Sequence, residues 1–135
     1  MDLERFLRQV VVWAESDAEV RAVALVGSHA RRAATETSDV DLVVLLRDPS
    51  TYLHDTSWTE RFGPVSRQSP EQYGRVTSVR VWYADGREVE FGLTDEGWSA
   101  LPLDEGTRRV VADGMRVLFE RDALLSRAVA RDGPA

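Results

Sequence analysis

Two aspartates separated by a single residue give the strongest chemical signal in this sequence of 135 residues. Asp39 and Asp41 stand at the start of an apolar run that is typical of a buried strand. Because side chains alternate along a strand, both carboxylates should point to the same face. Two like charges held this close repel each other unless a cation lies between them. Oxygen ligands suit Mg²⁺ or Mn²⁺, so the pair predicts a divalent metal site.

A second signal lies before the aspartates, where Gly27-Ser28 ends another short apolar run and helix-forming residues follow. Glycine permits a sharp turn, and the free N–H groups at the start of a helix favour phosphate. Ser28 adds a hydroxyl group. Arg31 follows about one helical turn later, which places its guanidinium within reach of the same anion. The segment therefore predicts a phosphate-binding turn.

The elements that must position these groups follow from hydropathy patterning. We predict an amphipathic helix over residues 2–15, a strand over 21–26, a short helix over 29–34 and a central strand over 39–47. Residues 49–75 show little periodicity and predict helix or loop. The rest predicts a hairpin of 76–83 and 88–93 around an Asp-Gly turn, then a helix (104–112), a strand (115–119) and a helix (121–130). This order indicates one α/β or α+β domain over residues 1–135, with a mixed sheet and flanking helices.

Missing residue types exclude several classes of chemistry. The sequence contains no Cys, no Lys and no Asn. Without Cys there are no disulfides, zinc fingers, iron–sulfur clusters or thiol nucleophiles. Without Lys there is no Schiff-base lysine and no Walker lysine, and without Asn there is no kinase catalytic loop. His29 and His54 are the only histidines, too few for a histidine-based metal site.

Charge and hydropathy point to the cytoplasm. The formal net charge is −6, which argues against stable binding of nucleic acid, because such proteins carry a basic face. The chain opens on acidic residues, unlike a signal peptide. Its apolar runs at 22–26 and 42–46 are far shorter than the roughly 20 residues of a membrane span. We expect a cytoplasmic protein with no membrane segment.

The combined motif, within residues 26–46, resembles the polymerase-beta-like nucleotidyltransferase superfamily. The nearest patterns are those of minimal nucleotidyltransferases and aminoglycoside nucleotidyltransferases, which read Gly-Ser-x-Ala-Arg-Gly, a short spacer, then Ser-Asp-x-Asp-Leu. This sequence departs from the pattern at Arg32, where the family has Gly. The matching positions are Gly27, Ser28, Ala30, Arg31, Ser38, Asp39, Asp41 and Leu42.

The resemblance implies a third carboxylate on a later strand. In the run of residues 87–93, Glu88, Glu90 and Gly92 share one face and the apolar residues share the other. Glu90 is our choice, because an acid between two large apolar residues is costly unless it is paired or binds a metal. Glu88 is the alternative, and both are ordinary solvated residues if this strand face is exposed. The family more often has Asp at this position.

The resemblance also implies an activity: AMP transfer from ATP to a hydroxyl acceptor, with two Mg²⁺ ions, or Mn²⁺ in their place. Asp39, Asp41 and Glu90 would be the catalytic and metal-binding residues. The nucleotide would be held by Gly27, Ser28, Arg31 and Ser38.

Only a short extension, about residues 95–135, follows the third carboxylate. The acceptor site is therefore expected to be small, shared in a homodimer, or completed by a partner in a hetero-complex. The acceptor is then a small hydroxylated molecule. The alternatives are an antitoxin that modifies a helical partner protein of the HEPN type, and a non-catalytic nucleotide-binding descendant.

Overall fold

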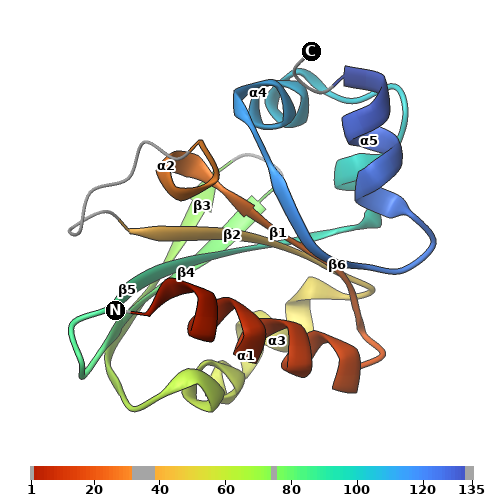
Figure 1. The fold of residues 1–135 in the computed structure, drawn as a ribbon. Coiled ribbons are helices and arrows are strands. Elements are labelled where there is room, and N and C mark those ends of the chain that lie inside the picture. The colour runs from red at the N-terminus through yellow and green to blue at the C-terminus, as the bar shows by residue number, and fades with distance from the viewer. Residues whose placement is uncertain (1, 32–38, 74–75, 133–135) are drawn as a thin grey trace.

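The computed structural model of the chain describes residues 2–31, 39–73 and 76–132. A six-stranded sheet in the order β3-β4-β5-β2-β1-β6 forms its centre (Figure 1). Strands β2 and β5 pair in parallel, and the other neighbouring strands pair antiparallel. The mixed sheet with flanking helices confirms the predicted fold class. The strands are β1 (Val20–Val26), β2 (Val40–Leu46), β3 (Val65–Tyr73), β4 (Val76–Tyr83), β5 (Glu88–Asp95) and β6 (Arg116–Glu120).

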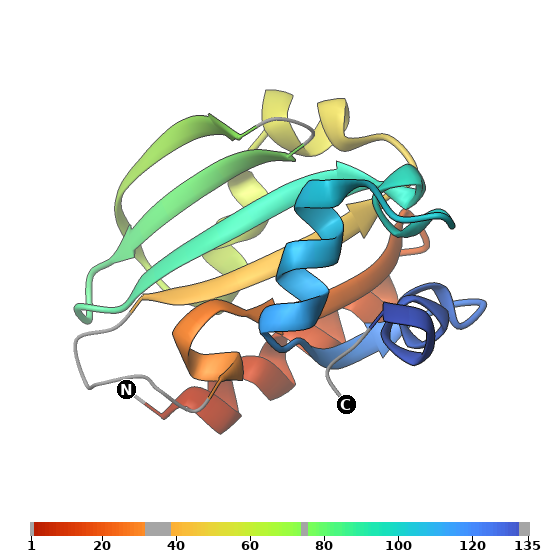
Figure 2. The same cartoon turned by 90° about the horizontal axis from the view of Figure 1, so that it is seen from above.

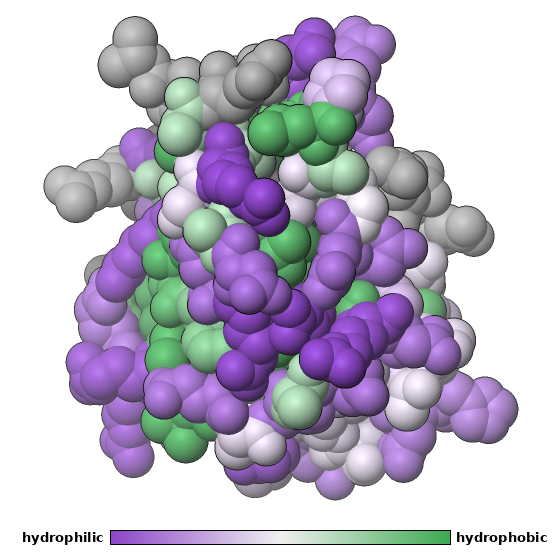
Figure 3. Space-filling model, turned by 90° about the vertical axis from the view of Figure 1, so that its right-hand side faces the viewer, coloured by the Kyte–Doolittle hydropathy of each residue, from purple (hydrophilic) through white to green (hydrophobic). Residues whose placement is uncertain are grey.

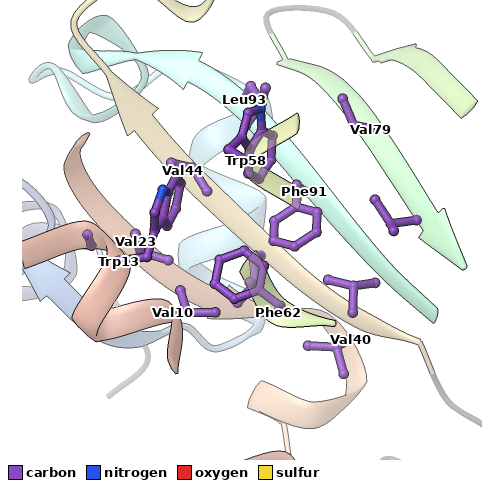
Figure 4. Packing of buried hydrophobic residues seen from close by; sticks show 14 of the residues in the cluster. Val10, Trp13, Val23, Val40, Val44, Trp58, Phe62, Val79, Phe91 and Leu93 are labelled. Atoms are coloured by element: carbon purple, nitrogen blue, oxygen red, sulfur yellow. The ribbon is translucent and has the colours of Figure 1, made fainter. Parts of the chain in front are cut away.

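One face of the sheet carries the main core, under helices α1 (Leu3–Ser16) and α3 (Pro49–His54) and the 3-10 segment η1 (Ser57–Phe62) (Figure 1). Aromatic rings join these helices to the strands, as Figure 4 shows. The ring of Trp13 stacks on Trp58 with 5.3 Å between centroids, and Trp58 meets Phe91 edge-on at 4.9 Å. Such pairs add about 0.5–1.5 kcal/mol to the free energy gained by burial alone. The side chains on this face of the sheet therefore stabilise the fold.

The opposite face is only partly covered. The 3-10 segment η2 (Glu96–Ser99), α4 (Glu105–Asp113) and α5 (Leu124–Asp132) lie over it, and the short helix α2 (Gly27–Ala30) stands at the end of β1 (Figure 2). A second, smaller core forms beneath them from Ala22, Ala24, Val43, Leu45, Trp98 and Leu125. In Figure 2, α4 crosses above β2 and β5, and no helix is drawn over β4 on this side of the sheet. We call this side of the sheet the open face.

Most predicted elements are present, with one clear exception. Residues 49–62 form helical turns, as the sequence indicates, but the expectation of helix or loop is wrong for residues 65–73, which form strand β3. This strand lies at the edge of the sheet and contains Pro70. An edge strand with polar residues on both faces shows no hydropathy alternation, and Pro is tolerated there. Helix α2 begins at Gly27, earlier than expected, and residues 32–34 of the predicted helix lie outside the described residues.

The molecular surface on the side drawn in Figure 3 is mainly hydrophilic, with apolar residues showing as separate patches. Large apolar side chains that are exposed include Val12, at 62%, and Leu101, at 44%. Within the described ranges, no helix is long and apolar enough to cross a membrane.

Candidate active site

The turn from β1 into α2 requires a glycine for two independent reasons. Gly27 has a φ of +71°, in the left-handed region that side chains disfavour. A Cβ atom at this position would also lie 2.4 Å from Oδ2 of Asp41. The backbone of the Gly-Ser turn therefore packs directly against the carboxylate of the second aspartate. The two halves of the sequence motif meet in space.

The aspartates sit at the start of the central strand, as their spacing predicts. Asp39 directly precedes β2, and Asp41 is its second residue, with Val26 of β1 and Glu90 of β5 as register partners. Along β2, Leu42 and Val44 enter the main core, so the alternation turns Asp41 to the open face. Parallel pairing in register thus places Asp41 and Glu90 side by side.

A basic residue that the sequence reasoning missed joins the acids to one another. Arg80 on β4 is the register partner of Glu90. Its Nη1 donates to Oδ2 of Asp39 and to Oε2 of Glu88, both at 2.6 Å, and its Nη2 donates to Oε2 of Glu90 at 2.8 Å. Its Nε donates to Oε1 of Glu71 on β3 at 3.2 Å. The sequence could not fix this partner, because a two-residue Asp-Gly turn would place residue 80 opposite residue 91, whereas the observed hairpin pairs Arg80 with Glu90.

The acids differ in their electrostatic surroundings. Burial raises the pKa of Asp41 to about 6, and repulsion from Glu90 and Asp39 adds to the effect, which the nearby Arg80 only partly offsets. For Arg80, burial by itself would lower the pKa, but hydrogen bonds to Glu88 and Asp39 and the attraction of Glu90 outweigh it, so the pKa is raised. Arg80 therefore stays cationic, while Asp41 holds its proton more tightly than a solvated aspartate does.

The donor chemistry of the cluster fits a divalent cation. Asp39, Asp41 and Glu90 offer only carboxylate oxygens, the ligands that Mg²⁺ and Mn²⁺ prefer, and after burial, repulsion from Glu90 and Asp39 adds to the raised pKa of Asp41. Across residues 2–31, 39–73 and 76–132, however, no three His, Asp or Glu side chains already converge on a metal position. The hydrogen bonds of Arg80 account for this, because they hold Asp39 and Glu90 to the guanidinium.

A cavity of about 460 Å³ opens beside the acids. Its polar lining residues are Arg31, Asp41, Ser78, Glu90 and Asp113, and Gly27 lines it as well. Most of the remaining wall is apolar and is built by Val26, Leu42, Val43, Val76, Trp98 and Val110. The volume is in the range of small-molecule sites, and mostly apolar walls with a few polar groups are their usual lining.

The floor of this cavity is shaped by two small residues on neighbouring strands. Gly92 on β5 is the register partner of Ser78 on β4. A Cβ atom on Gly92 would lie 2.9 Å from a methyl carbon of Val76, so the floor has no room for a side chain there. Ser78 is only 2% exposed and is one of the residues that line the cavity. A hydroxyl group at a cavity wall is a candidate ligand contact.

The sequence-predicted residues separate into three groups. Gly27, Arg31, Asp41 and Glu90 line one cavity, and Asp39 joins them through Arg80. Ser28 lies in α2 but is not among the lining residues, and Glu88 turns to Arg80 and to Trp82, whose Nε1 donates to Oε1 of Glu88 at 2.9 Å. Ser38 lies outside the described residues. The geometry therefore favours Glu90 over Glu88 as the third carboxylate.

Comparison with known proteins connects this geometry to a family. A sequence model of the family described as streptomycin adenylyltransferase matches residues 2–131. No curated protein shows significant similarity to the chain. Among solved structures, an aminoglycoside 6-adenyltransferase from Bacillus subtilis aligns with a TM-score of 0.53 and 18% identity, over 67% of this chain and 34% of that one.

A nucleotidyltransferase-like protein from Exiguobacterium sibiricum 255-15 aligns with a TM-score of 0.51 and 19% identity, over 96% of this chain and 38% of that one. At such identities the two structures show a shared fold. The chain spans little more than a third of the length of either protein. The family match confirms the resemblance to nucleotidyltransferases that the sequence motif indicated.

Proposed function

Because the chain belongs to the streptomycin adenylyltransferase family, we propose that it transfers a nucleoside monophosphate, AMP from ATP, to a hydroxyl acceptor. The observation that carries the proposal is the placement of Asp41 beside Glu90 in a cavity that the Gly27 turn also lines. This arrangement combines a surplus of negative charge with backbone that a ligand can approach closely.

In this proposal the Gly27 turn, Ser28 and Arg31 hold the triphosphate. Arg31 lines the same cavity as Asp41, which supports a role for its guanidinium in binding phosphate oxygens as charge develops on the leaving pyrophosphate. Ser38, which precedes the first aspartate, is proposed to assist from the sequence motif alone.

Asp39, Asp41 and Glu90 are the residues that would hold the two Mg²⁺ ions. Bound divalent ions supply neutralisation of the triphosphate and polarisation of the reacting oxygens. Asp41 and Glu90 line one cavity, and Asp39 is held near Glu90 by hydrogen bonds of both residues to Arg80. Above a pH of about 6, Asp41 is ionised in the metal-free protein and available as a ligand.

The acceptor is proposed to be a small hydroxylated molecule. A cavity of about 460 Å³ suits a small ligand, and its apolar wall around Trp98 suits a ring or a hydrocarbon face. Since the chain spans little more than a third of its structural relatives, further contacts to the acceptor would come from a second copy or from another polypeptide segment.

The proposal is tested by incubating the protein with ATP, Mg²⁺ and a panel of hydroxylated small molecules, and measuring pyrophosphate release and products heavier by AMP. Asp41→Asn should abolish both signals. Asp85→Asn removes an exposed carboxylate in the β4–β5 turn and should retain them. Equal pyrophosphate release from wild type and Asp41→Asn would reject the assigned site.

A further inference from the structure

Arg80 occupies an unusual position among the acids of the open sheet face. Its side chain is 18% exposed, and its guanidinium contacts four carboxylates from three different segments of the chain. Two of these, Asp39 and Glu90, are proposed metal ligands, and we call them the inner acids. The other two, Glu71 and Glu88, are not proposed as metal ligands, and we call them the outer acids.

The hydrogen bonds divide the guanidinium between the two pairs. Nη2 binds Glu90 at 2.8 Å, and Nε binds Glu71 at 3.2 Å. Nη1 is shared, at 2.6 Å from both Asp39 and Glu88. The guanidinium therefore bridges an inner and an outer acid with the same nitrogen. Losing the inner contacts would still leave it two carboxylate partners.

The outer position is fixed by an independent contact. Trp82 donates from Nε1 to Oε1 of Glu88, the carboxylate oxygen that Arg80 does not use. Glu88 is thus held by Trp82 whether or not Arg80 remains close to the inner acids. The geometry provides a carboxylate that can retain a guanidinium displaced from Asp39 and Glu90.

The number of negative charges around Arg80 explains why its guanidinium has two sets of carboxylate partners. One guanidinium carries a single positive charge against the four carboxylates that it contacts, and Asp41 adds a fifth negative group beside Glu90. A divalent ion carries twice the charge and would attract the inner acids more strongly than Arg80 does. Yet Arg80 is covalently tethered at the site, so an incoming ion must displace its hydrogen bonds.

We propose that Arg80 is a positioning residue that holds Asp39 and Glu90 ready in the metal-free protein and competes with the divalent cation for them. The outer acids retain its guanidinium when the inner acids turn to the metal. The inference rests on the proposed function, since it takes Asp39 and Glu90 as metal ligands. Its consequence is weak binding of free divalent ions, so that the metal enters together with the triphosphate.

The test measures binding of Mn²⁺ alone, by electron paramagnetic resonance, to the nucleotide-free protein. Arg80→Gln should bind Mn²⁺ about tenfold more tightly than wild type, because a competing unit charge has been removed from among the ligands. Arg67→Gln is the matched control: Arg67 lies over the Trp82 ring on the neighbouring strand, 4.1 Å from its centroid, and should change Mn²⁺ affinity by less than about twofold.

A second variant covers the case in which Arg80→Gln does not fold. Arg80→Lys keeps the charge but loses the fork that bridges inner and outer acids. It should bind Mn²⁺ about threefold more tightly than wild type, because fewer hydrogen bonds must be displaced. Circular dichroism establishes folding, and added Mn²⁺ should raise the melting temperature of the Arg80 variants more than that of wild type.

A double-mutant cycle separates direct competition from a general change in charge. Glu88→Gln should weaken Mn²⁺ binding in the wild-type background, because Arg80 then turns fully to the inner acids. In the Arg80→Gln background the same change should have a smaller effect. Equal effects in both backgrounds would contradict the role of Glu88 as a holding position.

The inference is overturned if the folded Arg80 variants bind Mn²⁺ no more tightly than wild type, or bind none at millimolar concentration. Binding of ATP with Mg²⁺ to wild type distinguishes a failure of the Arg80 inference alone from a failure of the proposed function. If wild type binds the nucleotide while the Arg80 variants show unchanged Mn²⁺ affinity, only the competition is rejected. If wild type binds no ATP, the proposed function fails as well.

Discussion

Asp41 and Glu90 are register partners on parallel strands, and their repulsion adds to the burial that raises the pKa of Asp41 to about 6. The fold retains this unfavourable pair although β2 is otherwise apolar. Strained or repelling groups that persist in a folded protein are typical of functional sites. The pair is the centre of the proposed active site, and the following experiments test the relationships around it.

The pH dependence of stability should report Asp41 in metal-free protein. Its pKa is raised from 3.8 to about 6 on folding, so the folded state binds the proton more tightly. The contribution of Asp41 to the free energy of unfolding is therefore fully present below pH 3.8 and is lost as the pH rises through 6. Asp41→Asn should remove this loss, leaving the variant more stable than wild type at pH 7.5 by about 1 kcal/mol after allowance for solvent screening.

Thermal denaturation with a chelator present, between pH 5 and pH 7.5, measures the difference. Asp85→Asn serves as the control, because Asp85 is exposed in a turn and has no carboxylate partner in the cluster. Identical pH profiles for wild type and Asp41→Asn would show that Asp41 carries no raised pKa.

Any side chain added at Gly27 should destabilise the turn between β1 and α2. Gly27→Ala places a Cβ atom 2.4 Å from Asp41 Oδ2 and forces alanine into positive φ. We expect a loss of stability of about 1–3 kcal/mol and loss of nucleotide binding, measured by thermal denaturation and calorimetry.

Gly86→Ala isolates the backbone contribution. Gly86 has a φ of +95°, but a Cβ atom added there would meet no other atom within 4 Å, so this variant should lose stability without losing nucleotide binding. Loss of binding in both variants would assign the effect to general destabilisation.

The third carboxylate can be identified by comparing two glutamates on one strand face. Glu90 lines the cavity beside Asp41, whereas Glu88 is held by Arg80 and Trp82. Glu90→Gln should reduce Mg²⁺-dependent ATP affinity by about tenfold or more, as expected for a lost metal ligand. Glu88→Gln should change it by only a few-fold. Calorimetric titration of ATP into both variants measures the two affinities. A larger loss of affinity in Glu88→Gln than in Glu90→Gln would assign the third carboxylate to Glu88.

Ser78 should contribute to ligand binding and little to stability. Ser78 is 2% exposed and lines the cavity, and no side-chain partner is needed to hold it in the sheet. Ser78→Ala should leave the free energy of unfolding within about 0.5 kcal/mol of wild type. It should weaken nucleotide binding about fivefold, because the loss of one hydrogen bond costs about 1 kcal/mol.

Ser99→Ala is the opposite case. Ser99 is also buried, but its hydroxyl already donates to the carbonyl oxygen of Glu96. This variant should lose some stability and keep its nucleotide affinity. Unchanged affinity in Ser78→Ala would show that the ligand does not reach the floor over Gly92.

Much of the site could be predicted from local sequence signals. The turn at Gly27 depends on the positive φ that glycine permits, and the direction of the Asp41 side chain depends on alternation along its strand. Both are properties of the local sequence. The pairing of Asp41 with Glu90 depends on parallel register between β2 and β5, which brings together residues far apart in the sequence. The resemblance to a family supplied that pairing, which the residues alone did not.

The rest of the site was hidden for physical reasons. Arg80 reads as an ordinary surface charge until the hairpin register places it opposite Glu90. Glu71 belongs to β3, an edge strand without hydropathy alternation, so its approach to Arg80 could not be anticipated. Apolar residues such as Val43 and Trp98 serve both the second core and the cavity wall, and only the packing of η2 and α4 shows which atoms face the opening.

The most direct measurement is a calorimetric titration of ATP into the protein, with Mg²⁺ and with a chelator, repeated for Asp41→Asn and Asp85→Asn. We predict binding by wild type and Asp85→Asn that requires Mg²⁺, and no binding by Asp41→Asn. ATP binding that is indifferent to Mg²⁺ and to Asp41, or no binding by wild type, would contradict a nucleotidyltransferase site at these carboxylates.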